Sequence, residues 1–267
     1  MTAIPLPRTR RFVLPQVSFL ALRVWQRNRD VYFNVWRSEL IWPLVEPLVT
    51  LVALGVGLGD FVELESDIDY VDFIGPALIA VFPMWTATAE CSYGSFFRMD
   101  QQGTFAAILA TPVSVDEVTT GEILWAMTRS LIGVFYVMVM VAIFGGLNSV
   151  SALLIFPFAI VPGLMFGAIS LAYTSIARTV SSLNYFFATY ITPQFWLSGA
   201  FFPLDEMPDW IETVAWFTPA YHVVRPYRAL AAGDADASHL IDLAWLVVVG
   251  AIAYSVAIVL MRRRLVK

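Results

Sequence analysis

The sequence contains little charge and almost no cysteine. Only 14% of its 267 residues are charged, whereas 59% are hydrophobic, and a soluble domain of this length needs a more polar shell. Its single cysteine, Cys91, lies in an apolar stretch without a partner, which excludes an intrachain disulfide and a thiolate metal cluster. We expect Cys91 to be a buried, unreactive thiol in a protein whose solvent is lipid.

Motifs for nucleotide hydrolysis and for common hydrolases are also absent. No GxxxxGK[ST] phosphate-binding loop, HExxH or GxSxG occurs, so we expect a chain that binds no metal, cofactor or nucleic acid and is not itself an enzyme. The first 39 residues contain seven arginines and no continuous apolar core. We therefore expect no secretory signal peptide and a cytoplasmic N-terminus.

Long apolar stretches predict an all-α polytopic membrane protein. About 20 residues of helix cross the hydrocarbon layer, and unpaired backbone groups are too costly there for other structures. We predict one membrane domain at 40–267, preceded by a cytoplasmic tail at 1–39. Its six predicted spans cover about 40–58, 71–93, 122–145, 151–177, 183–202 and 240–261.

The two predicted sides of the membrane differ in charge. The loop after the first span is acidic and lacks lysine and arginine. Arg225 and Arg228 are exceptions, in a long outer segment. By the positive-inside rule, both termini are expected in the cytoplasm. The basic residues that share this side are Arg8, Arg10, Arg11, Arg23, Arg27, Arg29, Arg37, Arg98, Arg178, Arg262, Arg263, Arg264 and Lys267.

Two segments combine apolar and polar residues without being able to span. Residues 15–37 mix aromatic residues with arginines, which predicts an amphipathic helix on the cytoplasmic surface, either seating a partner or acting as a simple anchor. Prolines at 203, 208 and 219 divide the segment before the last span. That segment is expected to form short re-entrant or interfacial helices on the outer face.

Two carboxylates, Glu46 and Glu90, fall within predicted spans, where an ionised side chain is costly unless it is paired or hydrated. They could couple protons to transport in a secondary transporter, although we find none of the repeats typical of such folds. We favour pairing with arginine or backbone, near helix ends or at a helix interface. A lipid-modifying enzyme is a further alternative, with acid and base candidates His222, Asp205, Glu206 and Asp209.

Two local patterns predict details of helix structure. Ser114 precedes Asp116 and Glu117, which is typical of a capped helix start. Gly163 and Gly167 form a GxxxG pattern, for which packing inside the bundle is favoured over a dimer contact.

Four sequence blocks resemble type-2 ABC transporter permeases, and within them the nodulation protein J group of lipooligosaccharide exporters. The likeness runs through most of the chain. The blocks are Glu46-Pro47-Leu48 with the glycines of ALGVGLG, AECSYGSFFRM at 89–99, TFAAILATPVSVDEVTTGEILWA at 104–126, and LSGAFFPLDEMPDWIETVAWFTPAYHVVRPYRAL at 197–230.

This resemblance implies a permease of a bacterial inner-membrane exporter for amphiphiles such as lipooligosaccharides, glycolipids, polysaccharides or drugs. It implies a dimer, expected to be a homodimer in contact with lipid, and two copies of a separate ATPase that binds ATP and magnesium. The implied coupling helix lies at about Met99 to Thr111, with Met99, Asp100, Gln101, Gln102, Thr104, Phe105, Ile108 and Leu109. Candidates for a substrate path are Trp85, Tyr93, Phe96, Phe97, Phe186, Phe187, Tyr190, Phe195 and Trp196.

Overall fold

Every regular element of the described residues is a helix. The computed structural model describes residues 15, 17–57, 69–204 and 207–266, and the expected all-α fold is confirmed. Most of the acidic loop after the first predicted span, together with Asp205 and Glu206, lies outside the described residues.

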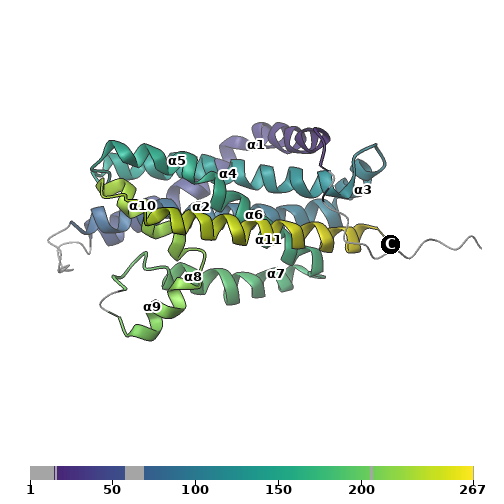
Figure 1. Ribbon diagram of the computed structural model, residues 1–267. Helices are drawn as coiled ribbons and strands as arrows, with labels where there is room; N and C mark the ends of the chain where they lie inside the picture. The colour runs from purple at the N-terminus through teal and green to yellow at the C-terminus, as the bar shows by residue number, and fades with distance from the viewer. Residues whose placement is uncertain (1–14, 16, 58–68, 205–206, 267) are drawn as a thin grey trace, which may run out of the picture.

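The helices form an elongated bundle (Figure 1). In chain order they are α1 (Leu20–Thr50), η1 (Leu51–Val56), α2 (Tyr70–Ala89), η3 (Glu90–Gly94), η4 (Phe97–Gln101), α3 (Thr104–Leu109), α4 (Val115–Ile143), η5 (Val150–Leu154), α5 (Ile155–Phe158), α6 (Ile160–Ile176), α7 (Val180–Phe186), η6 (Phe187–Ile191), α8 (Thr192–Leu197), α9 (Asp209–Trp216), α10 (Tyr221–Ala232) and α11 (His239–Leu265). The segments η1, η3, η4 and η6 are π-helical, whereas η5 is a 3-10 helix.

Several of these helices are long and apolar enough to cross a membrane. Four helical stretches meet both conditions among the described residues, and a fifth does so if a bent pair, Leu20–Glu39 and Leu44–Gly55, is one span. The two parts of that pair meet at 46°. The four single stretches are Tyr70–Gln101, Val115–Ile143, Val150–Ile176 and His239–Leu265. A multi-spanning protein is confirmed, while the number six stays a prediction.

The segment expected to span at 183–202 is helical without a break only from Val180 to Leu197, and it is not a regular α-helix throughout. It consists of α7, the π-helical η6 and α8, which ends at Leu197. Pro193 stands at the first turn of α8. Proline has no N–H to donate and its ring clashes with the carbonyl four residues earlier, so the regular α-helical ladder is interrupted at this point.

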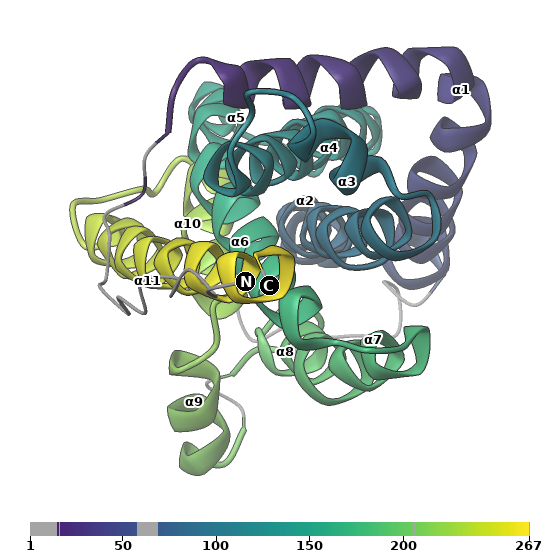
Figure 2. The same ribbon diagram turned by 90° about the vertical axis from the view of Figure 1, so that its right-hand side faces the viewer.

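α2 is the central helix, and α11 is the peripheral one. Of the most apolar window in each stretch, 72% is buried for Tyr70–Gln101 but only 17% for His239–Leu265. Figure 2 shows α2 near the middle of the bundle and α11 at its edge. The core around α2 extends to α10, where burial raises the pKa of the Tyr227 hydroxyl well above its usual range.

The first part of α1 lies across the bundle. Figure 2 shows it running over α4 before it bends and turns alongside α2. Val24, Asn28 and Tyr32 are buried at successive four-residue intervals, whereas Phe33 is 62% exposed. One face of α1 therefore packs on the bundle while aromatic and aliphatic side chains remain outside, as an amphipathic interfacial helix requires.

α3, the start of α4 and the end of α11 lie at the same end of the bundle (Figure 1), which we call the α3 end. Arg262 of α11 donates to Asp116 of α4, with Nε at 2.6 Å from Oδ1. Arg264 contacts Asp100 at 3.1 Å. Two of the arginines that the sequence places on one side of the membrane, Arg262 and Arg264, therefore lie at this end of the bundle.

Candidate functional site

Arg98 lies between two carboxylates from different helical segments. Its Nη2 is 2.8 Å from Glu90 Oε1 and 2.6 Å from Glu122 Oε2 in α4. The side chains of Arg98, Glu90 and Glu122 are only 13%, 14% and 1% exposed. Because a buried charge is costly unless it is paired, each of these groups depends on the others.

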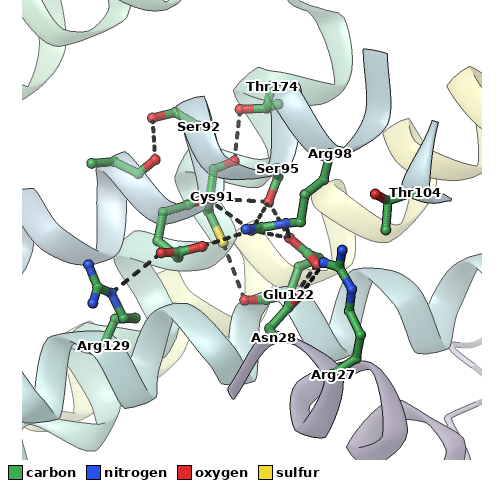
Figure 3. Close-up of polar contacts among 12 residues, drawn as sticks. Arg27, Asn28, Cys91, Ser92, Ser95, Arg98, Thr104, Glu122, Arg129 and Thr174 are labelled. Carbon is green, nitrogen blue, oxygen red and sulfur yellow. Dashed lines mark hydrogen bonds and ion pairs between the residues drawn. The ribbon is translucent and has the colours of Figure 1, made fainter. Parts of the chain in front are cut away.

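Glu122 accepts hydrogen bonds from three parts of the chain (Figure 3). Asn28 of α1 donates through Nδ2 at 2.8 Å, and the Ser95 hydroxyl donates at 2.6 Å. Arg98 adds Nε at 3.0 Å. A single buried carboxylate thus joins α1, the π-helical continuation of α2, and α4.

Arg129 of α4 connects a second part of α1 to the same cluster. Its Nη2 is 2.7 Å from Glu39 Oε2, and its Nε is 3.5 Å from Glu90 Oε2. The guanidinium also lies 4.4 Å from the centre of the Tyr32 ring, a favourable cation–π position. We call the whole set the charged network: Asn28, Glu39, Glu90, Arg98, Glu122 and Arg129.

A cavity of about 560 Å³ opens beside the charged network, between α1, α2 and α4. Glu46 and Glu90, the two carboxylates singled out in the sequence, both line it, as do Arg98 and Arg129. The preferred prediction of arginine pairing holds for Glu90. Glu46 is exposed in this chain and makes no side-chain hydrogen bond or ion pair with the described residues.

Aromatic side chains form a second feature on the other side of the cavity. Tyr93 stacks on Phe187 with ring centres 5.2 Å apart, and Trp85 contacts Phe187 at 5.5 Å and Phe195 at 5.9 Å. We call the connected set the aromatic seam: Trp85, Tyr93, Phe186, Phe187, Tyr190, Phe195 and Trp196. Phe96 and Phe97 contact each other instead.

The seam joins η3 to η6, two π-helical segments that face one another. The Tyr93 hydroxyl donates to Asn184 Oδ1 at 2.6 Å, which adds a polar contact between the same two regions. Trp85 also lines the cavity, and its Nε1 is buried without a hydrogen-bond acceptor among the described residues. The cavity therefore combines carboxylates, guanidinium groups and the aromatic side chains of Phe82 and Trp85 within one space.

The expected coupling segment is divided by Gly103. Met99, Asp100 and Gln101 belong to the long α2–η4 stretch, and Gly103, in the left-handed region at φ 65°, lets the chain turn into the short α3. A residue with a side chain is strained at that φ.

Within α3, Phe105 is only 1% exposed and packs in a core with α4 and α11. Its surface consists of small residues: Ala106, Ala107 and Ala110 are exposed, while Ile108 and Leu109 are partly buried. Phe105 is therefore a packing residue rather than a surface contact.

The start of α4 is capped as the sequence predicts. The Ser114 hydroxyl accepts from the Glu117 backbone N–H at 3.3 Å, and Glu117 accepts from the Ser114 N–H at 2.7 Å, a complete capping box. The Ser18 hydroxyl, just before α1, also donates to Glu117. This cap thus ties α1 to the loop that follows α3.

Glycines allow the close approach of helices at two places. A Cβ on Gly121 would lie 2.5 Å from Val24 Cβ and 2.7 Å from the Ala21 carbonyl oxygen, so α1 rests directly on the α4 backbone. Gly163 and Gly167 face residues of α4 such as Met127 and Ala126. The prediction that the GxxxG pattern packs inside the bundle is confirmed.

The residues considered for a lipid-modifying enzyme are not assembled into a site in the described part of the chain. His222 is 1% exposed; its Nδ1 lies 2.7 Å from Asp242 and its Nε2 2.7 Å from the Trp216 carbonyl oxygen. Asp209 is exposed at the start of α9. Asp205 and Glu206 lie outside the described residues. The His222 contacts join α10 to α11 and the end of α9.

Four members of the charged network, Asn28, Glu39, Glu122 and Arg129, are not singled out by the sequence. Arg129 falls inside a predicted span, and the rule that made Glu46 and Glu90 candidates would also select it. Glu122 stands at a predicted span boundary, where an acid is unremarkable. Asn28 carries no recognisable signal, because its role depends on α1 folding over α4. Cys91 is fully buried, as expected, with its sulfur 3.6 Å from the Glu122 carbonyl oxygen.

Comparison with known proteins adds evidence of a different kind. Residues 20–231 match the family model described as ABC-2 type transporter. Nodulation protein J of Rhizobium leguminosarum bv. trifolii is 30% identical over 95% of this chain and 97% of that protein. The protein of the same name in Bradyrhizobium diazoefficiens is 29% identical over 96% and 97%. The inner membrane transport permease YadH of Escherichia coli is 20% identical over 77% and 80%.

The fold and the comparisons together define a multi-spanning α-helical membrane protein that serves transport. The chain belongs to the ABC-2 type transporter family as a permease component, and membership of this family implies partnership with an ATPase subunit. The charged network, the cavity and the aromatic seam therefore lie in the permease component of an ABC transporter.

Proposed function

We propose that this chain is the permease of a bacterial exporter that moves an amphiphilic substrate outward across the cytoplasmic membrane. Two copies form a homodimer, and each copy engages one ATPase subunit at the α3 end. Both termini are then cytoplasmic, which agrees with the arginines gathered at that end. The ATPase binds ATP and magnesium, and this chain contributes no catalytic residue.

The observation that carries the proposal is the charged network, because it links the α3 end to the helices that line the cavity. α2 and η4 form a stretch that leads to Gly103 and α3. A displacement of α3 therefore moves Arg98, and the contacts of Glu122 with Arg98 and Asn28 pass this movement on to α4 and α1. Buried ion pairs have a narrow optimal geometry, so such a joint transmits displacement rather than absorbing it.

Coupling is proposed to use the exposed surface around α3. In this unit Phe105 anchors α3 to the bundle, and the neighbouring alanines form the surface that contacts the ATPase. The residues of the unit are Met99, Asp100, Gln101, Gln102, Thr104, Phe105, Ile108 and Leu109. The first part of α1 provides a second contact. Because α1 rests on α4 at Gly121 and is tied to Glu122, both contacts lead to the same network.

A substrate path is proposed along the cavity and the aromatic seam. Aromatic faces suit both acyl chains and sugar rings, and Trp85 connects the cavity to the aromatic seam because it lines the cavity and contacts Phe187. The relatives named nodulation protein J favour a lipooligosaccharide or related glycolipid as the substrate class. Phe96 and Phe97 are proposed to flank the path rather than form its wall.

The test is co-purification of the tagged chain with the ATPase from its native membranes, followed by ATP hydrolysis by the eluate. Ala107→Arg places a charged side chain on the exposed surface of α3 without disturbing the buried Phe105. Its matched control is Ala237→Arg, at an exposed alanine between α10 and α11.

We expect Ala107→Arg to reduce recovery of the ATPase at least tenfold, while the control recovers it normally. Equal recovery of the ATPase with both variants would show that α3 is not the coupling surface. Recovery of the wild-type chain alone, folded and without any ATPase, would refute the proposed assembly.

A further inference from the structure

A second cavity lies at the α3 end, away from the charged network. It has a volume of about 460 Å³ and lies between the end of α6 and the end of α11. Its described lining residues include three arginines and no acidic residue: Ser175, Ile176, Ala177, Arg178, Leu260, Arg263 and Arg264. Arg264 is paired with Asp100, but Arg178 and Arg263 add positive charge that favours an anion.

One of the three arginines is held in place by the protein itself. Arg264 Nη1 donates to the carbonyl oxygens of Thr174 at 2.6 Å and Ala177 at 2.5 Å, where α6 ends. Its Nη2 contacts Asp100 at 3.1 Å. Arg264 thus joins α11, α6 and η4 and forms a rigid back wall for the cavity.

The other two arginines are available to a ligand. Arg178 and Arg263 are exposed, and neither makes a side-chain hydrogen bond or ion pair with the described residues. The nearest carboxylate named above, Asp100, is already paired with Arg264. Two free guanidinium groups on neighbouring segments can bind one phosphate oxygen pair with good geometry.

The same cavity also has an apolar margin. Ile176 lines it and is 59% exposed, and Leu260 lines it from α11. Val256, one helical turn before Leu260, is 43% exposed and lies on the same face of α11. The cationic rim therefore adjoins an apolar surface on two membrane helices, which matches a ligand with a charged head and an acyl tail.

We propose that this cavity binds an anionic phospholipid, with its phosphodiester between Arg178 and Arg263 and an acyl chain along Ile176, Leu260 and Val256. Basic pockets between membrane helices are a recognised form of anionic headgroup site. The proposal does not depend on the direction of transport or on the substrate. Bound lipid would brace α6 against α11 through the wall that Arg264 forms.

The experiment measures binding of short-chain phosphatidylglycerol to the purified, detergent-solubilised full chain. Phosphatidylcholine tests the need for negative charge, and inorganic phosphate tests the need for an acyl chain. The test variant is Arg178→Gln with Arg263→Gln. The control is Arg225→Gln, which removes an arginine charge from an exposed position of α10, at the opposite end of the bundle.

Each arginine near an anionic headgroup contributes about 1 kcal/mol. We therefore expect phosphatidylglycerol to bind about 30-fold more weakly to the test variant and unchanged to the control. Native mass spectrometry should show the same loss of copurified anionic lipid. Circular dichroism checks that both variants remain folded, and single substitutions, each expected to cost about fivefold, replace the double variant if it does not.

Four results would overturn the proposal. They are unchanged phosphatidylglycerol binding by the test variant, an equal loss with the control, equal binding of phosphatidylcholine, and binding of inorganic phosphate as tight as that of the lipid. If the test variant lost the ATPase subunit but kept its lipid, the two arginines would be a protein contact instead.

Discussion

Replacing Arg98 by methionine tests the charged network most directly. The substitution removes the cation that separates Glu90 from Glu122, and both carboxylates are largely buried. Breaking a buried ion pair by removing one partner costs about 3 to 5 kcal/mol. Glu122 keeps its bonds from Asn28 and Ser95, and Glu90 keeps Arg129 at 3.5 Å, which places the expected loss near the lower value.

The assay is thermal unfolding of the purified chain in detergent. A loss of about 3 kcal/mol corresponds to a midpoint lowered by roughly 10 °C for a chain of this size. The matched control is Arg225→Met. Arg225 is 46% exposed and contacts Asp242 at 3.4 Å, so the same chemical change should cost under about 1 kcal/mol.

A second variant separates charge from packing. Arg98→Met combined with Glu90→Gln and Glu122→Gln leaves no uncompensated ion between the three positions, so much of the lost stability should return. The reasoning fails if Arg98→Met is no more destabilising than Arg225→Met, or if the triple variant is less stable than the single one. In either case packing, not ion pairing, would hold these helices together.

Two further substitutions test how α1 and α4 are held. Gly121→Ala should lower the free energy of unfolding by about 1 to 3 kcal/mol, because its Cβ would meet the α1 backbone at 2.7 Å. The control Gly133→Ala should be neutral or stabilising, since a Cβ there has no contact closer than 3.7 Å. Equal losses of stability in the two variants would contradict this packing. Ser114→Ala should lower the free energy of unfolding by about 1 kcal/mol, because the capping box is lost. Ser255→Ala should leave stability unchanged, since the Ser255 hydroxyl bonds only within its own helix. Equal stability of the two variants would rule out a stabilising cap.

The helices were predicted best where the signal is local. Apolar length alone places α4 and α11, and the Ser114 cap follows from residues three positions apart. The segment at 183–202 was harder, because its apolar composition suggests a continuous helix while Pro193 and the π-helical η6 interrupt it. The bend in α1 between Glu39 and Leu44 does have a sequence signal, because Pro43 falls within it and a proline inside a helix interrupts the hydrogen-bond ladder.

Parts of the candidate site were predictable for the same reason. Glu46 and Glu90 are candidates in the sequence because each is a charged residue in an apolar stretch. The aromatic residues are candidates because of their residue type. That both carboxylates line one cavity could not be inferred, since α1 and α2 meet only in the folded bundle. Phe105 illustrates the converse: its position in the expected coupling segment suggests a surface role, and the fold buries it.

Hydropathy and capping patterns by themselves determined that this protein is an α-helical membrane protein, and charge asymmetry predicts which side of the membrane holds most of its arginines. These properties depend on how each short stretch of sequence interacts with lipid and water, so they can be predicted without knowledge of the contacts between helices. Only the tertiary structure decided that Arg98 meets Glu122, that Asn28 completes their contact, and that Arg178 and Arg263 line one cavity. Such pairs lie far apart in the chain, and their short-range interactions exist only once helix packing has brought them together.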